Sequence, residues 1–331
     1  MITKDLIEQS VDRIATKRAF GEALVELGNT DASIVVLDGD LMESTTTALF
    51  AEAYPQRFFQ MHIAEQNMVG VAVGLSRMGF KPVVSTFAAF LTRAHDQLRM
   101  APLSGVSLYI NGAYGGVSIG RDGPSQMGLE DIAMMRALYG STVLYPSDAV
   151  SCRALSTLMF LQQGIVYLRT TREPTAVIYA ETESFVVGGS KVHGAKIRDT
   201  KYAICDTQKK NLVTIVGAGI TVHEALLAKH ELEKQGHAVR VIDCYSIKPI
   251  DVKTLVASAM DSKVFVVVED HYAQGGLGDA VFSTLATHVT QMPHCVHLAV
   301  NKPPMSGTPQ ELLSYEEIDS VAIVSAIRKL L

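Results

Sequence analysis

The chain has 331 residues, 48% of them hydrophobic, and its 34 acidic and 29 basic residues give a formal net charge of −5. Its length favours two domains of ordinary size. A negative charge without a basic cluster argues against a nucleic-acid partner, and charged residues interrupt every apolar run before the roughly 18–20 residues that span a bilayer. The high apolar content therefore favours extensive subunit interfaces over contact with lipid.

Two further features of composition predict a cytoplasmic protein. Residues 1–8 carry early acids and no apolar segment of the kind found in export signals. The cysteines show no Cys-x-x-Cys spacing, which favours reduced, buried thiols over disulfides or a zinc site. They are Cys152, Cys205, Cys244 and Cys295.

The first half of the chain alternates short β-branched runs with longer helical patterns, which is typical of α/β layers around a parallel sheet. The predicted strands are 33–37, 81–85, 106–110, 142–145 and 165–169, and the predicted helices are 17–27, 65–77, 91–101, 129–138 and 148–162. Residues 181–190 are polar and then glycine-rich, which predicts a linker.

A second α/β unit follows the predicted linker. Its predicted strands are 212–216, 239–243 and 263–268, and its predicted helices are 221–235 and 316–330. We therefore predict an α/β protein of two domains, residues 1–185 and residues 186–331.

A carboxylate and two aromatic rings form the most informative pattern. Glu65 opens an apolar helix, where an acid is favourable near the positive end of the helix dipole. Alternatively, its carboxyl lies in apolar surroundings, where desolvation favours the protonated form that can donate a proton. Phe87 and Phe90 end the next strand, where they serve either as core rings or as a stacking surface. A buried glutamate beside two rings is what the aminopyrimidine ring of thiamine diphosphate requires.

The glycine- and proline-rich loop 120–127 carries Asp122 and Gln126. Asp-Gly-Pro is strong turn chemistry, so a surface turn is one interpretation. The loop also follows a predicted parallel strand, and ligands bind at the carboxyl ends of such strands. Asp38 and Asp40 end another strand, but no third oxygen ligand is apparent nearby, so we assign no metal ligand.

Two motifs of the second half favour structural roles. Gly217 and Gly219 resemble the start of a dinucleotide fingerprint, but Val222 stands where the third glycine belongs, which favours a tight turn. His271, beside two acids in the run 269–272, is expected to be a structural histidine or an interface contact.

At these residues the sequence resembles the C-terminal half of a transketolase of the animal-type branch, over nearly the whole chain. The shared motifs are Leu37-Asp38-Gly39-Asp40 with Ser44-Thr45, Ile63-Ala64-Glu65-Gln66-Asn67-Met68, Ser85-Thr86-Phe87-Ala88-Ala89-Phe90, Gly116-Val117-Ser118-Ile119-Gly120, Asp122-Gly123-Pro124-Ser125-Gln126-Met127, Tyr145-Pro146-Ser147-Asp148, Arg169-Thr170 with Arg172, Ile247-Lys248-Pro249 and Val268-Glu269-Asp270-His271-Tyr272. The resemblance implies a pyrimidine-binding domain followed by the family's C-terminal domain.

The resemblance also implies roles for individual residues. Glu65 would contact N1′ of the aminopyrimidine as the catalytic carboxylate. The implied cofactor-binding residues are Asp40, Glu65, Phe87, Phe90 and Gln126, and the implied substrate-binding residues are Lys17, Ser44, Tyr114, Asp122 and Arg172. The chain departs from the family at two of these positions. Tyr114 replaces a histidine near the substrate phosphate, and Lys17-Arg18 stands where the family has Arg-Lys.

The implied function is a subunit of a split transketolase, which moves a two-carbon ketol unit from a phosphoketose to an aldose. Members of the family bind the cofactor's diphosphate and its Mg²⁺ or other divalent cation through a Gly-Asp-Gly motif and a later Asn, which this sequence lacks. We therefore expect a separate diphosphate-domain chain, in a two-plus-two heterotetramer. The alternatives are the β subunit of a 2-oxo acid dehydrogenase E1 component and a non-catalytic regulatory or scaffold subunit.

Overall fold

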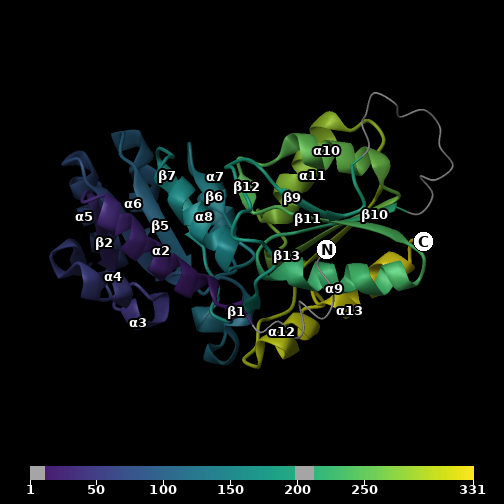
Figure 1. Cartoon of the computed structure of the whole chain (residues 1–331), viewed down its shortest axis with the longest axis horizontal. Helices are drawn as coiled ribbons and strands as arrows, with labels where there is room; N and C mark the ends of the chain where they lie inside the picture. The colour runs from purple at the N-terminus through teal and green to yellow at the C-terminus, as the bar shows by residue number, and fades with distance from the viewer. Residues whose placement is uncertain (1–11, 198–211) are drawn as a thin grey trace.

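A seven-stranded sheet forms the centre of the first domain in the computed structural model, which describes residues 12–197 and 212–331 (Figure 1). The strand order is β12-β6-β7-β5-β4-β2-β3, and all neighbours are parallel except β12, which is antiparallel to β6. The strands are β2 (Ile34–Asp38), β3 (Phe58–Gln60), β4 (Lys81–Phe87), β5 (Leu108–Ala113), β6 (Thr142–Leu144), β7 (Ile165–Arg169) and β12 (Ser246–Lys248).

Helices cover both faces of this sheet, as the near-continuous apolar runs of its central strands require. One face packs against α2 (Thr16–Thr30) and α8 (Ala149–Met159). The other packs against α5 (Glu65–Arg77), α6 (His95–Met100) and α7 (Asp131–Ala137). The smaller elements are β1 (Arg13–Ile14), paired with β8 (Thr175–Ala176), and the helices α3 (Met42–Thr45) and α4 (Ala48–Ala53).

The second domain holds a five-stranded sheet in the order β14-β13-β10-β11-β9. β10 (Leu212–Gly217), β11 (Ala238–Asp243), β13 (Val264–Tyr272) and β14 (His294–Val300) run parallel, and β9 (Lys191–Gly194) is antiparallel to β11. In Figure 1 the sheet lies between α10 (Val252–Asp261) and α11 (Leu277–His288) on one side and α9 (Ile220–Lys234) and α13 (Ser320–Arg328) on the other. The short helix α12 (Pro309–Tyr315) precedes α13.

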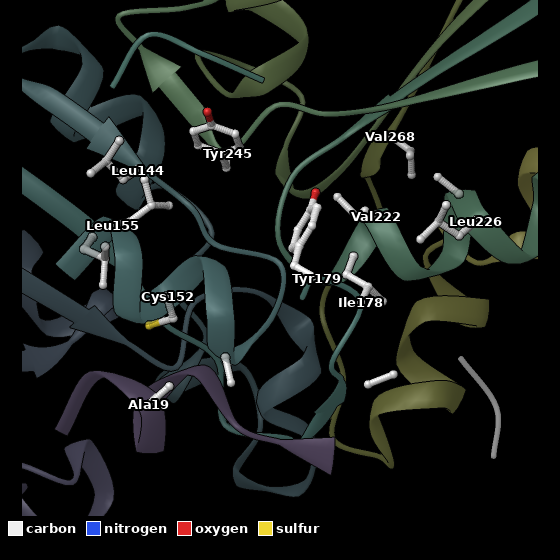
Figure 2. Close-up of a cluster of buried hydrophobic side chains, with 14 of the residues drawn as sticks. Ala19, Leu144, Cys152, Leu155, Ile178, Tyr179, Val222, Leu226, Tyr245 and Val268 are labelled. Carbon is white, nitrogen blue, oxygen red and sulfur yellow. The ribbon is translucent and has the colours of Figure 1, made fainter. Parts of the chain in front are cut away.

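The two domains share a continuous apolar core. Figure 2 shows Leu155 of the first domain on one side and Val222 of the second on the other, with Tyr179 between them. The second domain also contributes β12 as an edge strand of the first sheet, where Ser246 pairs with Leu144. The domains therefore meet through both packing and backbone hydrogen bonds.

The expected fold class is confirmed, and every strand expected from the sequence is present with its ends shifted by a few residues. Two expected helices are wrong in extent. The pattern at 91–101 forms the 3₁₀ helix η2 (Ala88–Ala94) followed by α6. The pattern at 316–330 yields α13 alone, because Glu317 adopts a positive φ of 58° between α12 and α13.

The remaining sequence expectations for the fold have mixed outcomes. Among the described thiols, which are free, Cys152 and Cys244 are buried, but Cys295 on β14 at the edge of its sheet is exposed, so the expectation of burial is wrong there. Cys205 and residues 1–8 lie outside the described residues.

Residues 181–190 contain neither helix nor strand, as expected of a linker. No helix within the described ranges is long and apolar enough to cross a membrane.

The motifs of the second half have the expected structural roles. Gly219 makes a tight turn before α9 at a positive φ of 58°, with its backbone against the Tyr145 ring. Glu269 accepts hydrogen bonds from the first backbone amides of α11 (Leu277 N, 2.6 Å) and from His297 Nε2 at 2.5 Å. His271 accepts from Ala133 N (3.2 Å) through Nε2 and bonds the Tyr272 carbonyl (2.6 Å) through Nδ1, so it is a satisfied structural histidine.

A buried arginine that forms an ion pair within the first domain also bonds the second domain. Arg169, at the end of β7, is fully buried, and its guanidinium donates to both carboxylate oxygens of Asp131 at 2.8 and 3.1 Å. It also donates to the Gly128 carbonyl (2.7 Å) and to the Asp270 carbonyl of the second domain (3.0 Å). The Arg169 side chain therefore forms hydrogen bonds to α7, to the loop before α7 and to β13.

We predict that Arg169→Met lowers the free energy of unfolding by about 3–5 kcal/mol, because it leaves the Asp131 carboxylate buried without its partner. Arg169→Lys should restore little, since an ammonium cannot reproduce the bidentate geometry. Urea denaturation followed by circular dichroism measures both. The matched control is Arg153→Met on α8, whose ion pair with Glu181 is solvent-accessible and should contribute less than about 1 kcal/mol. Equal losses for Arg169→Met and Arg153→Met would contradict this role.

Candidate functional site

Most of the candidate residues follow the carboxyl ends of parallel strands. The strand register aligns Asp38 of β2 with Ser85 of β4, Phe87 of β4 with Ala113 of β5, and Gly112 of β5 with Arg169 of β7. Residues just beyond these ends consequently gather at one edge of the sheet, which is where open α/β sheets bind ligands.

Glu65 lies at this edge as the first residue of α5 and is 3% exposed. Arg93, in η2, places its Nη1 atom 2.6 Å from Glu65 Oε1. Of the two alternatives for Glu65, the carboxyl in apolar surroundings does not describe this structure, because a guanidinium faces it. Sequence reasoning missed Arg93, although its position three residues after Phe90 was a usable signal.

Three rings form a row beside Glu65. The Phe87 and Phe90 centroids are 5.4 Å apart with planes 23° apart, and the Phe87 and Tyr114 centroids are 4.3 Å apart with planes 29° apart. Phe87 and Tyr114 are buried, whereas Phe90 is partly exposed. The guanidinium carbon of Arg93 lies 4.6 Å from the Phe90 centroid. The two predicted ring positions are thus brought together, and Tyr114 extends the row.

A second group of predicted residues surrounds Tyr114. Lys17, in the first turn of α2, donates from Nζ to Tyr114 Oη at 3.0 Å and to the Ser44 carbonyl at 2.9 Å. Arg18 instead points to Glu22, with Nε 2.6 Å from Oε1. Lys17 is therefore the cation of this pair that contacts Tyr114 and Ser44.

Arg172 lies on the other side of Tyr114, with its guanidinium carbon 5.6 Å from the ring centroid. Its Nη1 atom is 2.9 Å from Asp122 Oδ1 and donates to the Ile119 carbonyl at 3.2 Å. Partial burial opposes the charged form of Arg172, but the hydrogen bond and charge of Asp122 outweigh it and raise the Arg172 pKa. Two cations therefore flank one tyrosine at this end of the site.

Asp38 organises the loop that carries Ser44. Its buried carboxylate accepts from Leu41 N (2.6 Å), Thr45 Oγ1 (2.9 Å) and Thr47 Oγ1 (2.8 Å). Desolvation raises the pKa of Asp38, while these three hydrogen bonds act in the opposite direction. The carboxylate oxygens of Asp38 therefore hold the loop in place by hydrogen bonds. The part of the chain that the structure describes contains no cluster of three or more His, Cys, Asp or Glu residues suited to a metal ion.

The last two predicted cofactor residues lie in loops beyond the strands. Asp40 follows β2 with a positive φ of 70°, and its backbone N–H donates to Gln60 Oε1 at 2.9 Å. Gln126 ends the 3₁₀ helix η5 (Pro124–Gln126), which packs against η2, the element that carries Phe90. The buried hydroxyl of Thr86, one residue before Phe87, has no hydrogen-bond partner among the described residues.

Comparison with known proteins identifies the family. Residues 12–176 match the model of the transketolase pyrimidine-binding domain, and residues 202–323 match that of the transketolase C-terminal domain. The chain belongs to the transketolase family. It is 45% identical to human transketolase over 324 residues, which cover 97% of this chain and 49% of that protein. It is 44% identical to bovine transketolase-like protein 1, over 97% of this chain and 52% of that protein.

Solved structures agree with this assignment. A structure described as a split gene transketolase, inactive β4 tetramer, matches with a TM-score of 0.81 and 37% identity, covering 97% of this chain and 99% of that one. Transketolase from Campylobacter jejuni shares the fold at a TM-score of 0.79 and 18% identity, over 98% of this chain and 50% of that one. The chain thus spans about half the length of the curated transketolases it matches.

Proposed function

We propose that this chain is one subunit of a thiamine diphosphate-dependent transketolase and transfers a two-carbon ketol unit from a phosphoketose to an aldose acceptor. The observation that carries the proposal is the buried Glu65 carboxylate beside the Phe87–Phe90 ring pair, with a cation-flanked Tyr114 at the other end of the row. One end of this arrangement suits a flat nitrogen heterocycle, and the other suits an anionic substrate group.

The residues fit the aminopyrimidine of thiamine diphosphate. The planar guanidinium of Arg93 lies over Phe90 and donates to Glu65, so a flat nitrogen-containing group reaches both side chains in this geometry. Glu65, Phe87 and Phe90 would hold the aminopyrimidine, with Asp40 and Gln126 toward the reactive end of the cofactor. When bound, thiamine diphosphate supplies the nucleophilic carbon and the electron sink needed to break the C2–C3 bond of the ketose.

The chain's own residues supply acid–base chemistry and orientation. Glu65 would hold a proton in a hydrogen bond to N1′ and exchange it during turnover, and its burial excludes water from that bond. Asp122 would accept a hydrogen bond from a sugar hydroxyl, while Lys17, Ser44 and Arg172 would bind the substrate phosphate through charge-assisted and neutral hydrogen bonds.

We further propose a partner chain that carries the diphosphate-binding domain and most of the ligands for Mg²⁺ or another divalent cation. The match to a split gene transketolase, over 97% of this chain and 99% of that one, supports this proposal. The tetramer of that neighbour is described as inactive and made of β subunits alone. We propose a two-plus-two heterotetramer in the cytoplasm.

We predict that Glu65→Gln lowers kcat for ketol transfer by at least about 10²–10⁴-fold in the complex with the partner, because the amide keeps the size of the side chain but cannot exchange the proton. Ketol transfer between a phosphoketose and an aldose is the assay, and it also distinguishes transketolase from an E1 component, which decarboxylates 2-oxo acids, and from a scaffold subunit. Glu52→Gln, on the exposed side of α4, is the matched control. A Glu65→Gln complex with half of its activity would refute the assignment.

Partner dependence predicts weak cofactor binding by the chain alone. Isothermal titration calorimetry with thiamine diphosphate and Mg²⁺ should give a Kd at least about 100-fold higher for the isolated chain than for the complex, because the charged diphosphate is then unpaired. The isolated chain should also show no ketol transfer. Tight binding and full turnover without the partner would exclude the proposed division of labour.

The Tyr114 position predicts an altered preference for the substrate's phosphate end. We expect Tyr114→His to lower KM for phosphorylated substrates by about tenfold near pH 6, where the imidazole is protonated and adds a charged donor. KM for unphosphorylated sugars should stay constant. Tyr139→His, at an exposed tyrosine, is the control. If KM is unchanged for every phosphosugar tested, Tyr114 does not contact the phosphate.

A further inference from the structure

Arg93 makes two contacts at once. Its Nη1 atom donates to Glu65 Oε1 at 2.6 Å, and its guanidinium carbon lies 4.6 Å from the centroid of the Phe90 ring. These two groups, a carboxylate oxygen and a ring face, are the ones that the proposed function assigns to the aminopyrimidine of the cofactor.

A guanidinium and an aminopyrimidine resemble each other in the properties that this site recognises. Both are flat, both present nitrogen atoms in the plane that can share a hydrogen bond with Glu65, and both stack on aromatic rings. Within one chain, Glu65 Oε1 and the Phe90 face that Arg93 covers cannot bind both groups in the same way. We infer that Arg93 occupies the aminopyrimidine position in the isolated chain and must swing aside before the cofactor binds.

The exposure of the two partners favours such a movement. The Glu65 side chain is 3% exposed and is fixed at the start of α5, whereas the Arg93 side chain is 51% exposed. A long, half-exposed arginine can turn its charged head into water while its stem stays against the protein. The movement would leave Glu65 in place and uncover the Phe90 ring.

The Arg93–Glu65 contact also stabilises the subunit while no cofactor is bound. A buried carboxylate without a partner is strongly destabilising, and the guanidinium removes that penalty while no cofactor is bound. N1′ of the incoming ring would then take the place of Arg93 at Glu65, with the proton held by Glu65 in that bond, so the carboxyl group has a hydrogen-bond partner in both states. Arg93 would thus stabilise the free subunit and compete with the cofactor.

This inference rests on the proposed function, and it is tested by binding. The probes are 4-amino-5-hydroxymethyl-2-methylpyrimidine, which has the aminopyrimidine alone, and thiamine diphosphate with Mg²⁺, each titrated calorimetrically into the full-length chain. Removing a competitor that fills the site about 90% of the time tightens the apparent Kd about tenfold. We expect this gain for the pyrimidine probe with Arg93→Ala. Arg93→Lys, which keeps the charge without the flat face, should show a smaller gain.

The control is Arg99→Ala on α6, where the arginine pairs with Asp96 at the surface, and its Kd should equal that of the unmodified chain. Circular dichroism verifies that Arg93→Ala is folded; if it is not, Arg93→Gln replaces it and should show the same direction of change. An unchanged or weaker Kd in the folded Arg93 variant overturns the inference, and so does the absence of measurable binding to every variant.

Two further titrations separate this inference from the proposed function. Thiamine diphosphate should bind the complex with the partner, and Phe90→Ala or Glu65→Gln should weaken that binding. If the complex does not bind the cofactor, the proposed function fails. If the complex binds it through Phe90 and Glu65 while Arg93→Ala gives no gain for the pyrimidine probe, only the inference about Arg93 fails.

Discussion

The structure depends most on the buried ion pair of Arg169 and Asp131. Burial alone would lower the pKa of Arg169, but the charge of Asp131 outweighs burial and raises that pKa above its usual value, so the guanidinium stays charged. The guanidinium donates hydrogen bonds to groups from different segments: the Asp131 carboxylate, the Gly128 carbonyl and the Asp270 carbonyl. The geometry of the first domain's site loops is thereby tied to the second domain.

The close packing around this ion pair fixes the loop that carries Tyr114. A side chain at Gly115 would place its Cβ 2.1 Å from Arg169 Nε, and one at Gly116, where φ is +87°, would lie 1.8 Å from Asp270 Oδ2. Asp270 in turn accepts a hydrogen bond from Val117 N at 2.7 Å. Only glycine permits this approach, so the site loop and the domain junction form one packed unit.

The sequence alone predicted those features that leave a local residue pattern or that follow from a parallel strand order. β-branched runs predicted the central strands, and parallel topology implied that Glu65, Phe87 and Phe90 would meet at one sheet edge. β12 had no such signal, because three residues pair across domains with β6 about a hundred residues earlier. Arg93 was missed because its partner Glu65 lies 28 residues away, and η2 broke the helical pattern that was expected there.

Tyr114 couples the two ends of the site. It stacks on Phe87 at 4.3 Å and bonds Lys17 through its hydroxyl, while its backbone keeps a positive φ of 61°. A buried non-glycine residue holds such a conformation only where its surroundings over-determine it, and such residues concentrate at functional sites. The ring face that would position the cofactor and the cations that would bind phosphate therefore depend on one side chain. The contacts of Tyr114 thus join the ring row to the two cations through a single side chain.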